Sequence, residues 1–377
     1  MKTITTKSLK KDTKEAVNEV IATLKTADNI KAILFFASSN HDDIAVSMLQ
    51  EAFPNVEVFG CTSMGEISSG SYTIDSFVAT AFTDEMIEDI KVVVPTKLAA
   101  GKVDIDDEIA ELEKHFGVQF HKLEKEKYYG IVLCDYGDIK VVSEADFYDS
   151  IGDMTSCVFT GATAAAMDFV FEKTRVFAKG KAHKAAAVVA LIKSKVPFAF
   201  EKIEAVERPN IPATITKMDE NGIILEMEGM SPADFYAKIH NVTREEVLKW
   251  DYNALMQYSL GVMIEGEPFM HTIIRFFDDG SLKIDPPIRL NEEVELFKAK
   301  DLVSTTREQM AKIREKHPNM TFMIDFDCGY RTMDAQMNNT LKEYEAIYND
   351  TPMIGFATYG EYFISKITQT SAMLLFM

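Results

Sequence analysis

Two segments of this 377-residue chain contain two glycines at the same spacing, with a glutamate directly after the second glycine. Residues 60–66 (GCTSMGE) and 355–361 (GFATYGE) share the pattern G-x-x-x-x-G-E, and each follows a short apolar run typical of a β-strand. Because glycine weakens a strand, the paired glycines predict a turn that needs positive φ or a close approach between backbones. The carboxylate then stands at the mouth of that turn, where it can bind a cation or a hydroxyl group.

A thiol and a guanidinium follow another predicted strand, residues 322–326 (FMIDF). Arginine suits bidentate binding of a carboxylate, so Arg331 together with Glu361 or Glu66 would satisfy both charges of an amino acid. Backbone amides beside the first glycines, and neighbouring hydroxyl groups, would complete the site. The predicted ligand-binding residues are Gly60, Cys61, Thr62, Gly65, Glu66, Cys328, Arg331, Gly355, Thr358, Tyr359, Gly360 and Glu361.

The same charged residues also have interpretations that need no ligand. Both glutamates can cap the backbone amides of their own turns. Arg331 can pair with a nearby acid at the edge of the core: Asp325, Asp327 or Asp334. The G-x-x-x-x-G-E pattern is not a phosphate-binding loop, because that loop needs Lys and then Ser or Thr after the second glycine.

The two segments belong to a unit that occurs three times in the sequence. Each copy reads as strand, polar segment, helix, strand, special loop and strand. The first strands are 32–37, 129–134 and 322–326, and the last are 76–82, 185–192 and 370–377. In the middle copy, whose polar segment is 135–137, Ala166 and Met167 replace the second glycine and the glutamate. These units predict an α/β fold with mixed sheets, in which ligands favour the crevice beyond strand ends.

The length and a proline-interrupted stretch predict two domains. Pro197, Pro209 and Pro212 break strand and helix patterns alike. We predict a first domain of residues 1–200 with two units. A second domain, residues 201–377, holds an inserted α+β element and the third unit.

Two local signals define the inserted α+β element. Asn221-Gly222 predicts the turn of a β-hairpin. The segment 243–246 (TREE) is a capping box, and it predicts the start of a helix whose apolar face continues to Tyr258.

Composition excludes several classes of protein. The net charge of −19 disfavours nucleic acid as a partner, because phosphate contacts need a basic face. No apolar run approaches the roughly 20 residues of a membrane span, and the N-terminus lacks the apolar core of a secretory signal. The four cysteines form no C-x-x-C pair, which favours a reducing compartment. We therefore expect a cytoplasmic protein with no membrane partner.

On these residues the chain resembles the FIST family, whose members carry paired FIST N and FIST C sensory domains. The resemblance rests on 32–39 and 59–67 near the N-terminus, and on 213–230, Arg275, 328–331 and 355–361 beyond them. It implies ligand sensing in bacterial signal transduction, with amino acids among the proposed ligands. The two FIST halves consume the chain, so the signal would pass to a separate output protein.

Two alternatives to an amino-acid sensor remain open. Some similar sensors bind haem, and His41 follows the first strand at the crevice end, so it is the histidine best placed to be an axial ligand. A cysteine-dependent enzyme would use Cys328 beside Arg331, although Asp325 and Asp327 oppose formation of the thiolate. We expect no catalytic residue, no metal site outside haem and no other cofactor.

Overall fold

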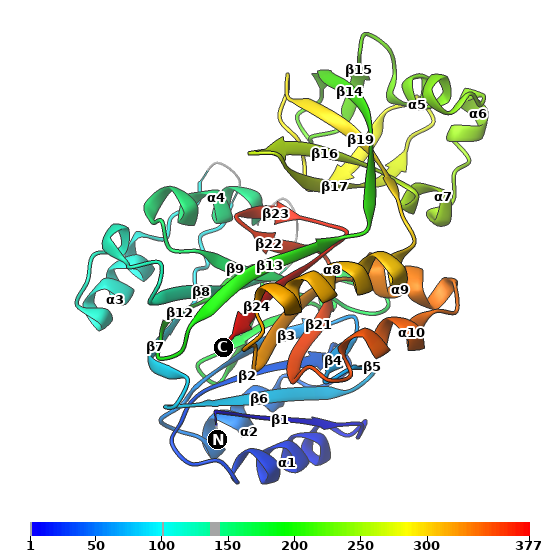
Figure 1. The fold of residues 1–377 in the computed structure, drawn as a ribbon. Helices are drawn as coiled ribbons and strands as arrows, with labels where there is room; N and C mark the ends of the chain where they lie inside the picture. The colour runs from blue at the N-terminus through cyan, green and yellow to red at the C-terminus, as the bar shows by residue number, and fades with distance from the viewer. Residues whose placement is uncertain (1, 100–101, 136–143) are drawn as a thin grey trace. The chain divides into compact units, whose positions relative to one another are not determined.

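The computed structural model describes residues 2–99, 102–135 and 144–377 (Figure 1). Most of the predicted polar segment 135–137, namely Tyr136 and Gly137, lies outside the described residues. The chain forms two compact units, which are described separately below. The first comprises Met1–Ile203, Arg307–Lys366 and Ser371–Met377, and the second comprises Glu204–Thr306 and Ile367–Thr370.

Three six-stranded sheets with the same strand order build the first unit. The first sheet runs β1 (Thr3–Ser8), β6 (Phe77–Thr83), β2 (Ile30–Ser38), β3 (Glu57–Ser63), β10 (Val176–Ala178), β11 (Lys181–His183). The second runs β7 (Ile87–Val93), β12 (Ala187–Ser194), β8 (Tyr128–Cys134), β9 (Phe159–Thr163), β22 (Glu361–Phe363), β23 (Ser365–Ile367). The third runs β13 (Phe198–Glu204), β24 (Thr370–Phe376), β20 (Phe322–Cys328), β21 (Met353–Thr358), β4 (Glu66–Ser68), β5 (Ser71–Thr73).

The pairing inside the three sheets is also the same. The central strands β2, β8 and β20 pair in parallel with β3, β9 and β21. On their other side they pair antiparallel with β6, β12 and β24. The connection between the parallel strands is a helical crossover, which parallel neighbours require. The predicted α/β fold with mixed sheets is confirmed.

Each sheet is completed by a hairpin that follows the loop of another sheet. The β4–β5 hairpin pairs with β21, β10–β11 with β3, and β22–β23 with β9. The exchange is cyclic. The hairpin after the loop of the first sheet joins the third sheet, the one after the loop of the third joins the second, and the one after the loop of the second joins the first. A strand edge left open would expose unpaired backbone groups, so this exchange protects all three sheets.

The first glycine of each loop lies where two parallel strands approach closely. A Cβ atom added to Gly60 would lie 2.0 Å from the Phe35 carbonyl oxygen, and one added to Gly355 would lie 2.3 Å from that of Asp325. In the middle copy, Gly161 would meet the Val132 oxygen at 1.7 Å. Of the two reasons that the sequence offers for these glycines, close approach is therefore the one that the three sheets share.

Helices cover the sheets of this unit, and their ends follow local signals. Asp12 accepts a hydrogen bond from the Glu15 amide and caps the first helix, and Gly117 ends the third helix with a φ of 67°. The helices are α1 (Thr13–Leu24), α2 (Ile44–Ala52), α3 (Asp106–Phe116), η1 (Phe120–Lys122), α4 (Glu144–Met154), η2 (Phe171–Lys173), α8 (Leu302–Lys316), α9 (Gly329–Met337), α10 (Leu341–Glu345) and η3 (Ala346–Tyr348).

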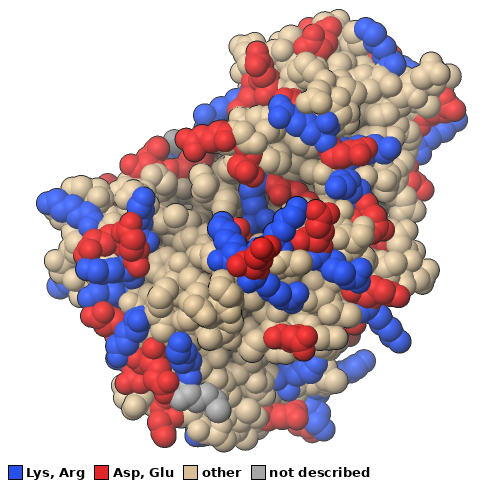
Figure 2. Space-filling model, viewed as in Figure 1, with Lys and Arg blue, Asp and Glu red and all other residues tan. Residues whose placement is uncertain are grey.

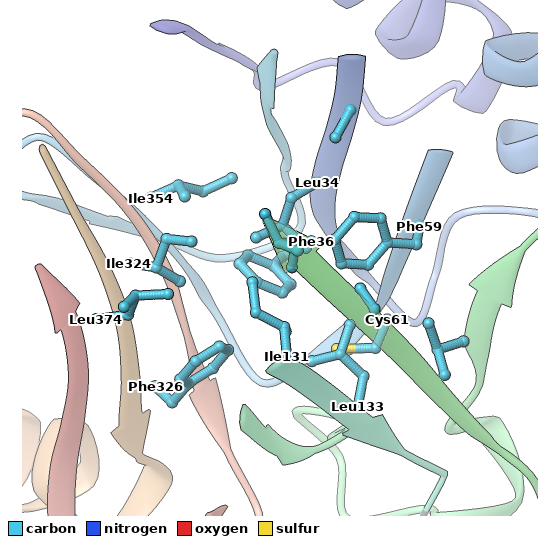
Figure 3. Packing of buried hydrophobic residues seen from close by; sticks show 14 of the residues in the cluster. Leu34, Phe36, Phe59, Cys61, Ile131, Leu133, Ile324, Phe326, Ile354 and Leu374 are labelled. Atoms are coloured by element: carbon cyan, nitrogen blue, oxygen red, sulfur yellow. The ribbon is translucent and has the colours of Figure 1, made fainter. Parts of the chain in front are cut away.

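A central core fills the space between the three sheets (Figure 3). Alternate residues of each central strand point into it, as the two-residue period of a strand requires. The opposite faces of β2 and β8 pack in separate clusters with the helices. Figure 3 labels Leu34, Phe36, Phe59, Cys61, Ile131, Leu133, Ile324, Phe326, Ile354 and Leu374 in the central core.

The second unit is a closed barrel with short helices. Its apolar core includes Ile215, Leu260 and Ile273. The predicted hairpin turn is confirmed, because Gly222 has a φ of 74° between the first two barrel strands. In barrel order the strands are β14 (Val206–Met218), β15 (Ile224–Met227), β18 (Leu282–Asp285), β17 (Glu267–Phe276), β16 (Tyr258–Ile264) and β19 (Glu293–Ala299), and the helices are α5 (Pro232–His240), α6 (Arg244–Val247) and α7 (Tyr252–Met256).

The helix predicted after Thr243 is shorter than expected. Its capping box is present, with reciprocal bonds between Thr243 and Glu246. The helix ends at Val247, however, and a new helix begins with Asp251 as its cap. Tyr258 opens strand β16, because its backbone pairs with Lys298 of the barrel. The prediction of one helix to Tyr258 was wrong, since barrel pairing overrides the apolar spacing.

Charges of both signs are interspersed on the face of the molecule seen in Figure 2. The net charge of −19 is therefore not gathered into one acidic field on this face. Among the helices of the described residues, none is long and apolar enough to cross a bilayer.

We expect Gly60→Ala to lower the free energy of unfolding by about 1–3 kcal/mol, the usual cost of overpacking. The added methyl group meets a backbone oxygen, which cannot rotate away. Gly152→Ala is the control: this glycine is exposed in α4, and an added Cβ meets nothing within 4 Å. It should gain up to about 1 kcal/mol. Urea unfolding measures both, and equal stability of the two variants would contradict the close-approach explanation.

Candidate functional site

The three special loops meet at one end of the first unit. The Met64 amide donates to the Ala357 carbonyl at 3.1 Å, and the Ala357 amide donates to the Gly65 carbonyl at 2.8 Å. The third loop joins them, since the Ala165 amide donates to the Thr62 carbonyl at 2.9 Å. The two G-x-x-x-x-G-E segments, nearly 300 residues apart in sequence, are thus direct neighbours.

Both predicted glutamates are buried and hold their own turns. Glu66 accepts hydrogen bonds from the Ser63 hydroxyl and from the Ser76 amide and hydroxyl, at 3.1 and 2.5 Å for the latter two. Glu361 accepts from the Thr358 hydroxyl at 2.6 Å, the equivalent bond of the other loop. Burial raises the pKa of Glu66 to about 7, although its hydrogen bonds oppose the shift.

Most of the predicted ligand-binding residues lie inside the protein. Tyr359 is the one with a partly exposed side chain; Gly60, Cys61, Thr62, Gly65, Glu66, Cys328, Arg331, Gly355, Thr358, Gly360 and Glu361 are buried. The Tyr359 ring stacks on exposed Phe169 at 5.9 Å, and its hydroxyl donates to the Ala166 carbonyl at 2.5 Å. Ligand contact by these residues stays a prediction.

Arg331 is 3 % exposed and pairs with Asp327, one of the acids that the sequence analysis named as a partner. The Arg331 Nε donates to the Asp327 carboxylate at 2.8 Å. The hydroxyl of Tyr344, whose ring lies next to the guanidinium, donates to the same carboxylate at 2.9 Å. A guanidinium NH donates to the Ile203 carbonyl at 3.5 Å. The arginine therefore neutralises an internal acid at the carboxyl end of β20.

Asp325 and Asp327 form a pair of buried carboxylates that the sequence analysis did not select as site residues. They are two residues apart, so they share one face of β20, and both are at most 1 % exposed. The Ser371 hydroxyl donates to Asp325 at 2.7 Å. A signal was available in the sequence, because alternate acids interrupt an otherwise apolar strand, FMIDFDC.

The other two sheets have apolar residues where β20 has these acids. Gly355 pairs with Asp325 in the parallel ladder, just as Gly60 pairs with Phe35. In the same register Gly161 pairs with Val132. Two residues further on, Ala37 and Cys134 correspond to Asp327. The other two sheets thus have apolar side chains at the positions that the acids occupy in β20.

A small pocket opens beside the two acids. It has a volume of about 20 Å³, which suits one water-sized group. Its rim includes half-buried residues of the exchanged β4–β5 hairpin, where the Tyr72 amide donates to Glu345 at 2.7 Å. The lining residues are Ile67, Gly70, Ser71, Tyr72, Asp325, Asp327, Thr332, Tyr344, Glu345 and Tyr348.

The electrostatics of the pocket favour a proton on one acid. Burial raises the pKa of Asp325 to about 8, and the charge of Asp327 adds to the shift. The Ser371 hydroxyl and Arg331 oppose it. Burial also raises the pKa of Asp327, against the stabilising charge of Arg331. Two acids and one arginine are neutral together only when one acid carries a proton.

The four cysteines are all buried, and none of them forms a disulfide within the described residues. Burial raises the pKa of Cys61, Cys134 and Cys157, which disfavours the thiolate that a nucleophile needs. Cys328 is 1 % exposed at the end of β20. Within residues 2–99, 102–135 and 144–377, no group of three or more His, Cys, Asp or Glu side chains is arranged to hold a metal ion.

Family models account for most of the sequence. The FIST N domain model matches residues 31–230, and the FIST C domain model matches residues 232–364. The chain belongs to the FIST family. A comparison with curated proteins matches none of them. FIST domains occur in sensory signal-transduction proteins that bind small ligands, so the family is sensory rather than catalytic.

The FIST N and FIST C matches divide the chain at a different place from its compact units. The matches meet near residue 231, within the second compact unit. The predicted division at 200/201 lies close to the end of the first segment of the first unit, Ile203. The strands of the third copy, β20 and β21, belong to the first compact unit although they fall in the FIST C match.

We expect Arg331→Ala in this FIST protein to cost about 3–5 kcal/mol of unfolding free energy, because it leaves Asp327 buried without its partner. Arg307→Ala, at an exposed position of α8, should change it by less than about 0.5 kcal/mol. Combining Arg331→Met with Asp327→Asn should recover part of the loss. Urea unfolding measures all three, and an Arg331→Ala variant as stable as the control would show that the pair is not structural.

Proposed function

We propose that this FIST protein is a cytoplasmic sensor in bacterial signal transduction that binds a small charged molecule, an amino acid being the leading candidate. One observation carries the proposal: the acids Asp325 and Asp327 line a pocket at a strand end, where the equivalent residues of the other sheets are apolar. Strand ends in α/β sheets are common ligand sites.

The amino group is the part of the ligand that the pocket suits. Carboxylates recognise ammonium groups through charge-assisted hydrogen bonds. This assigns to Asp325 and Asp327 the role that the sequence analysis gave to Glu66 and Glu361, whose oxygens hold their own turns. The carboxylate of the ligand would then lie toward the pocket rim, near the β4–β5 hairpin.

Signal output would pass to a separate partner protein. The hairpin that borders the pocket starts directly after the second glycine of the first loop and pairs with β21 over only three residues. A ligand that changes this short pairing would alter the junction of all three loops. We further propose that the three sheets arose from one repeated unit, because strand order, pairing and glycine position agree in all of them.

A thermal-shift screen against amino acids tests the proposal. A ligand that binds only the native state at one hundred times its Kd adds about 2.7 kcal/mol of stability, which raises Tm by several degrees. Asp325→Asn should abolish the shift while leaving the protein folded. Glu343→Gln, an exposed acid of α10 outside the pocket lining, should keep it. No shift with any amino acid would reject this ligand class, and a shift that survives Asp325→Asn would place its site elsewhere.

Haem binding through His41 is a second prediction, supported by the resemblance to haem-binding sensors. His41 is 9 % exposed, its Nδ1 lies 3.3 Å from the Thr13 hydroxyl, and its ring packs against Phe77. An axial ligand must present a ring nitrogen to the iron, so this packing would have to open. Hemin titration should give a Soret shift that His41→Ala removes. No shift, or one that the variant leaves unchanged, would reject His41 as the ligand.

A further inference from the structure

The pocket beside β20 is lined by a buried tyrosine whose hydroxyl group makes no hydrogen bond of normal geometry to the described residues. The Tyr348 side chain is 3 % exposed and lines the pocket together with Asp325 and Asp327. Across the part of the chain that the structure describes, its oxygen makes no hydrogen bond. A buried hydroxyl without a partner is costly, which points to a group that binds there.

The residues around the pocket have the chemistry of a cation site. The side chains of two aspartates line it, and three tyrosine rings, those of Tyr72, Tyr344 and Tyr348, line the same space. Aromatic rings and carboxylates together bind ammonium groups well. The volume of about 20 Å³ admits one ammonium-sized group and is too small for a quaternary ammonium.

When both aspartates are ionised, the buried pair carries one negative charge more than Arg331 balances, while the half-buried Glu345 accepts the Tyr72 amide at the rim. Arg331 balances Asp327, to which it donates at 2.8 Å. Asp325 has a hydroxyl donor in Ser371 but no such salt bridge among the described ion pairs, so a proton or a cation must balance it. The titratable or charged groups around Asp325 are Asp327, Arg331, Tyr72, Tyr344, Glu345 and Tyr348.

We propose that this pocket binds a single ammonium group, either free ammonium or the amino end of a larger ligand, in exchange for the proton of Asp325. The neutral acid loses its proton to solvent, and the resulting carboxylate accepts hydrogen bonds from the incoming ammonium. The Tyr348 oxygen accepts another N–H bond. Net charge in the pocket is unchanged, so the buried site avoids an uncompensated charge. The inference rests on the proposed small-molecule function and names the group that is recognised.

The direction of the pH dependence follows from this exchange. Because the pKa of Asp325 is raised to about 8, the acid is protonated at neutral pH, and binding must displace that proton. Apparent affinity for ammonium should therefore rise as pH increases from 6 toward 8. Between pH 4 and 8 the unliganded protein loses stability as pH rises, because the folded state holds a proton that the unfolded carboxyl releases.

Titration calorimetry of the full chain with ammonium chloride and methylammonium chloride, at constant ionic strength, tests the exchange. Repeating the titration in buffers of different ionisation enthalpy counts the protons released. We expect close to one proton per site at pH 6.5 and, with methylammonium, which stays protonated there, close to none at pH 9. Tetramethylammonium should bind at least tenfold more weakly, because it exceeds the pocket and donates no hydrogen bond. Potassium should also bind more weakly than ammonium, because it donates no hydrogen bond.

Three variants separate the contributions. Asp325→Asn should abolish proton release and lower affinity for ammonium at least tenfold, with the fold checked by circular dichroism. Tyr348→Phe keeps the ring, so it should lower affinity several-fold and leave proton release unchanged. Glu343→Gln should behave as the unmodified protein.

Several results would overturn the inference. They are proton release that persists in Asp325→Asn, tetramethylammonium or potassium binding as tightly as ammonium, and no heat with ammonium or methylammonium. An amino-acid thermal shift without any ammonium response would overturn this inference and leave the proposed function standing. An ammonium response without an amino-acid shift would support this inference and reject the amino-acid ligand.

Discussion

The close approach of two parallel strands at the first glycine of each loop is the constraint on which the first unit depends. Any side chain at Gly60 or Gly355 would collide with the carbonyl oxygen of the neighbouring strand. The same glycine lies opposite the hairpin that arrives from another sheet. In each of these two loops, the first glycine therefore contacts both the parallel neighbouring strand and the exchanged hairpin. Because the exchange is cyclic, the three loops together join all three sheets.

The three sheets have the same strand order and equivalent parallel pairs, so their central strands can be compared residue by residue. The faces of β2 and β8 that meet the helices are apolar, as a packed interior requires. The same face of β20 carries Asp325 and Asp327. Removing these carboxyl groups from water costs free energy, a cost that the apolar residues of the other two sheets do not have. Arg331, Tyr344 and Ser371 offset part of that cost. Asp325 has no ion-pair partner among the described residues, and the Tyr348 hydroxyl makes no hydrogen bond of normal geometry there.

The pocket lies beside the hairpin that leaves the loop junction. One side of it comes from β20 and the helices after it, and the other from the β4–β5 hairpin that begins at Glu66. Glu66 holds this hairpin start through Ser63 and Ser76, and burial raises its pKa to about 7. Glu66 thus holds the start of the hairpin that forms one side of the pocket.

The sequence by itself determined the α/β class, the strands and helices of the three copies, and the FIST family, because apolar periodicity and glycine spacing are local signals. It also named Asp327 as one partner for Arg331. It could not show that the hairpins are exchanged between sheets, or that a barrel ends the helix expected to reach Tyr258, because both depend on pairing between distant segments. Glu66, Glu361 and Arg331 look like ligand-binding residues when read along the chain, and only the tertiary structure shows their internal partners. The pocket that Asp325 and Tyr348 line is likewise decided by the tertiary structure, because it is built from segments far apart in sequence.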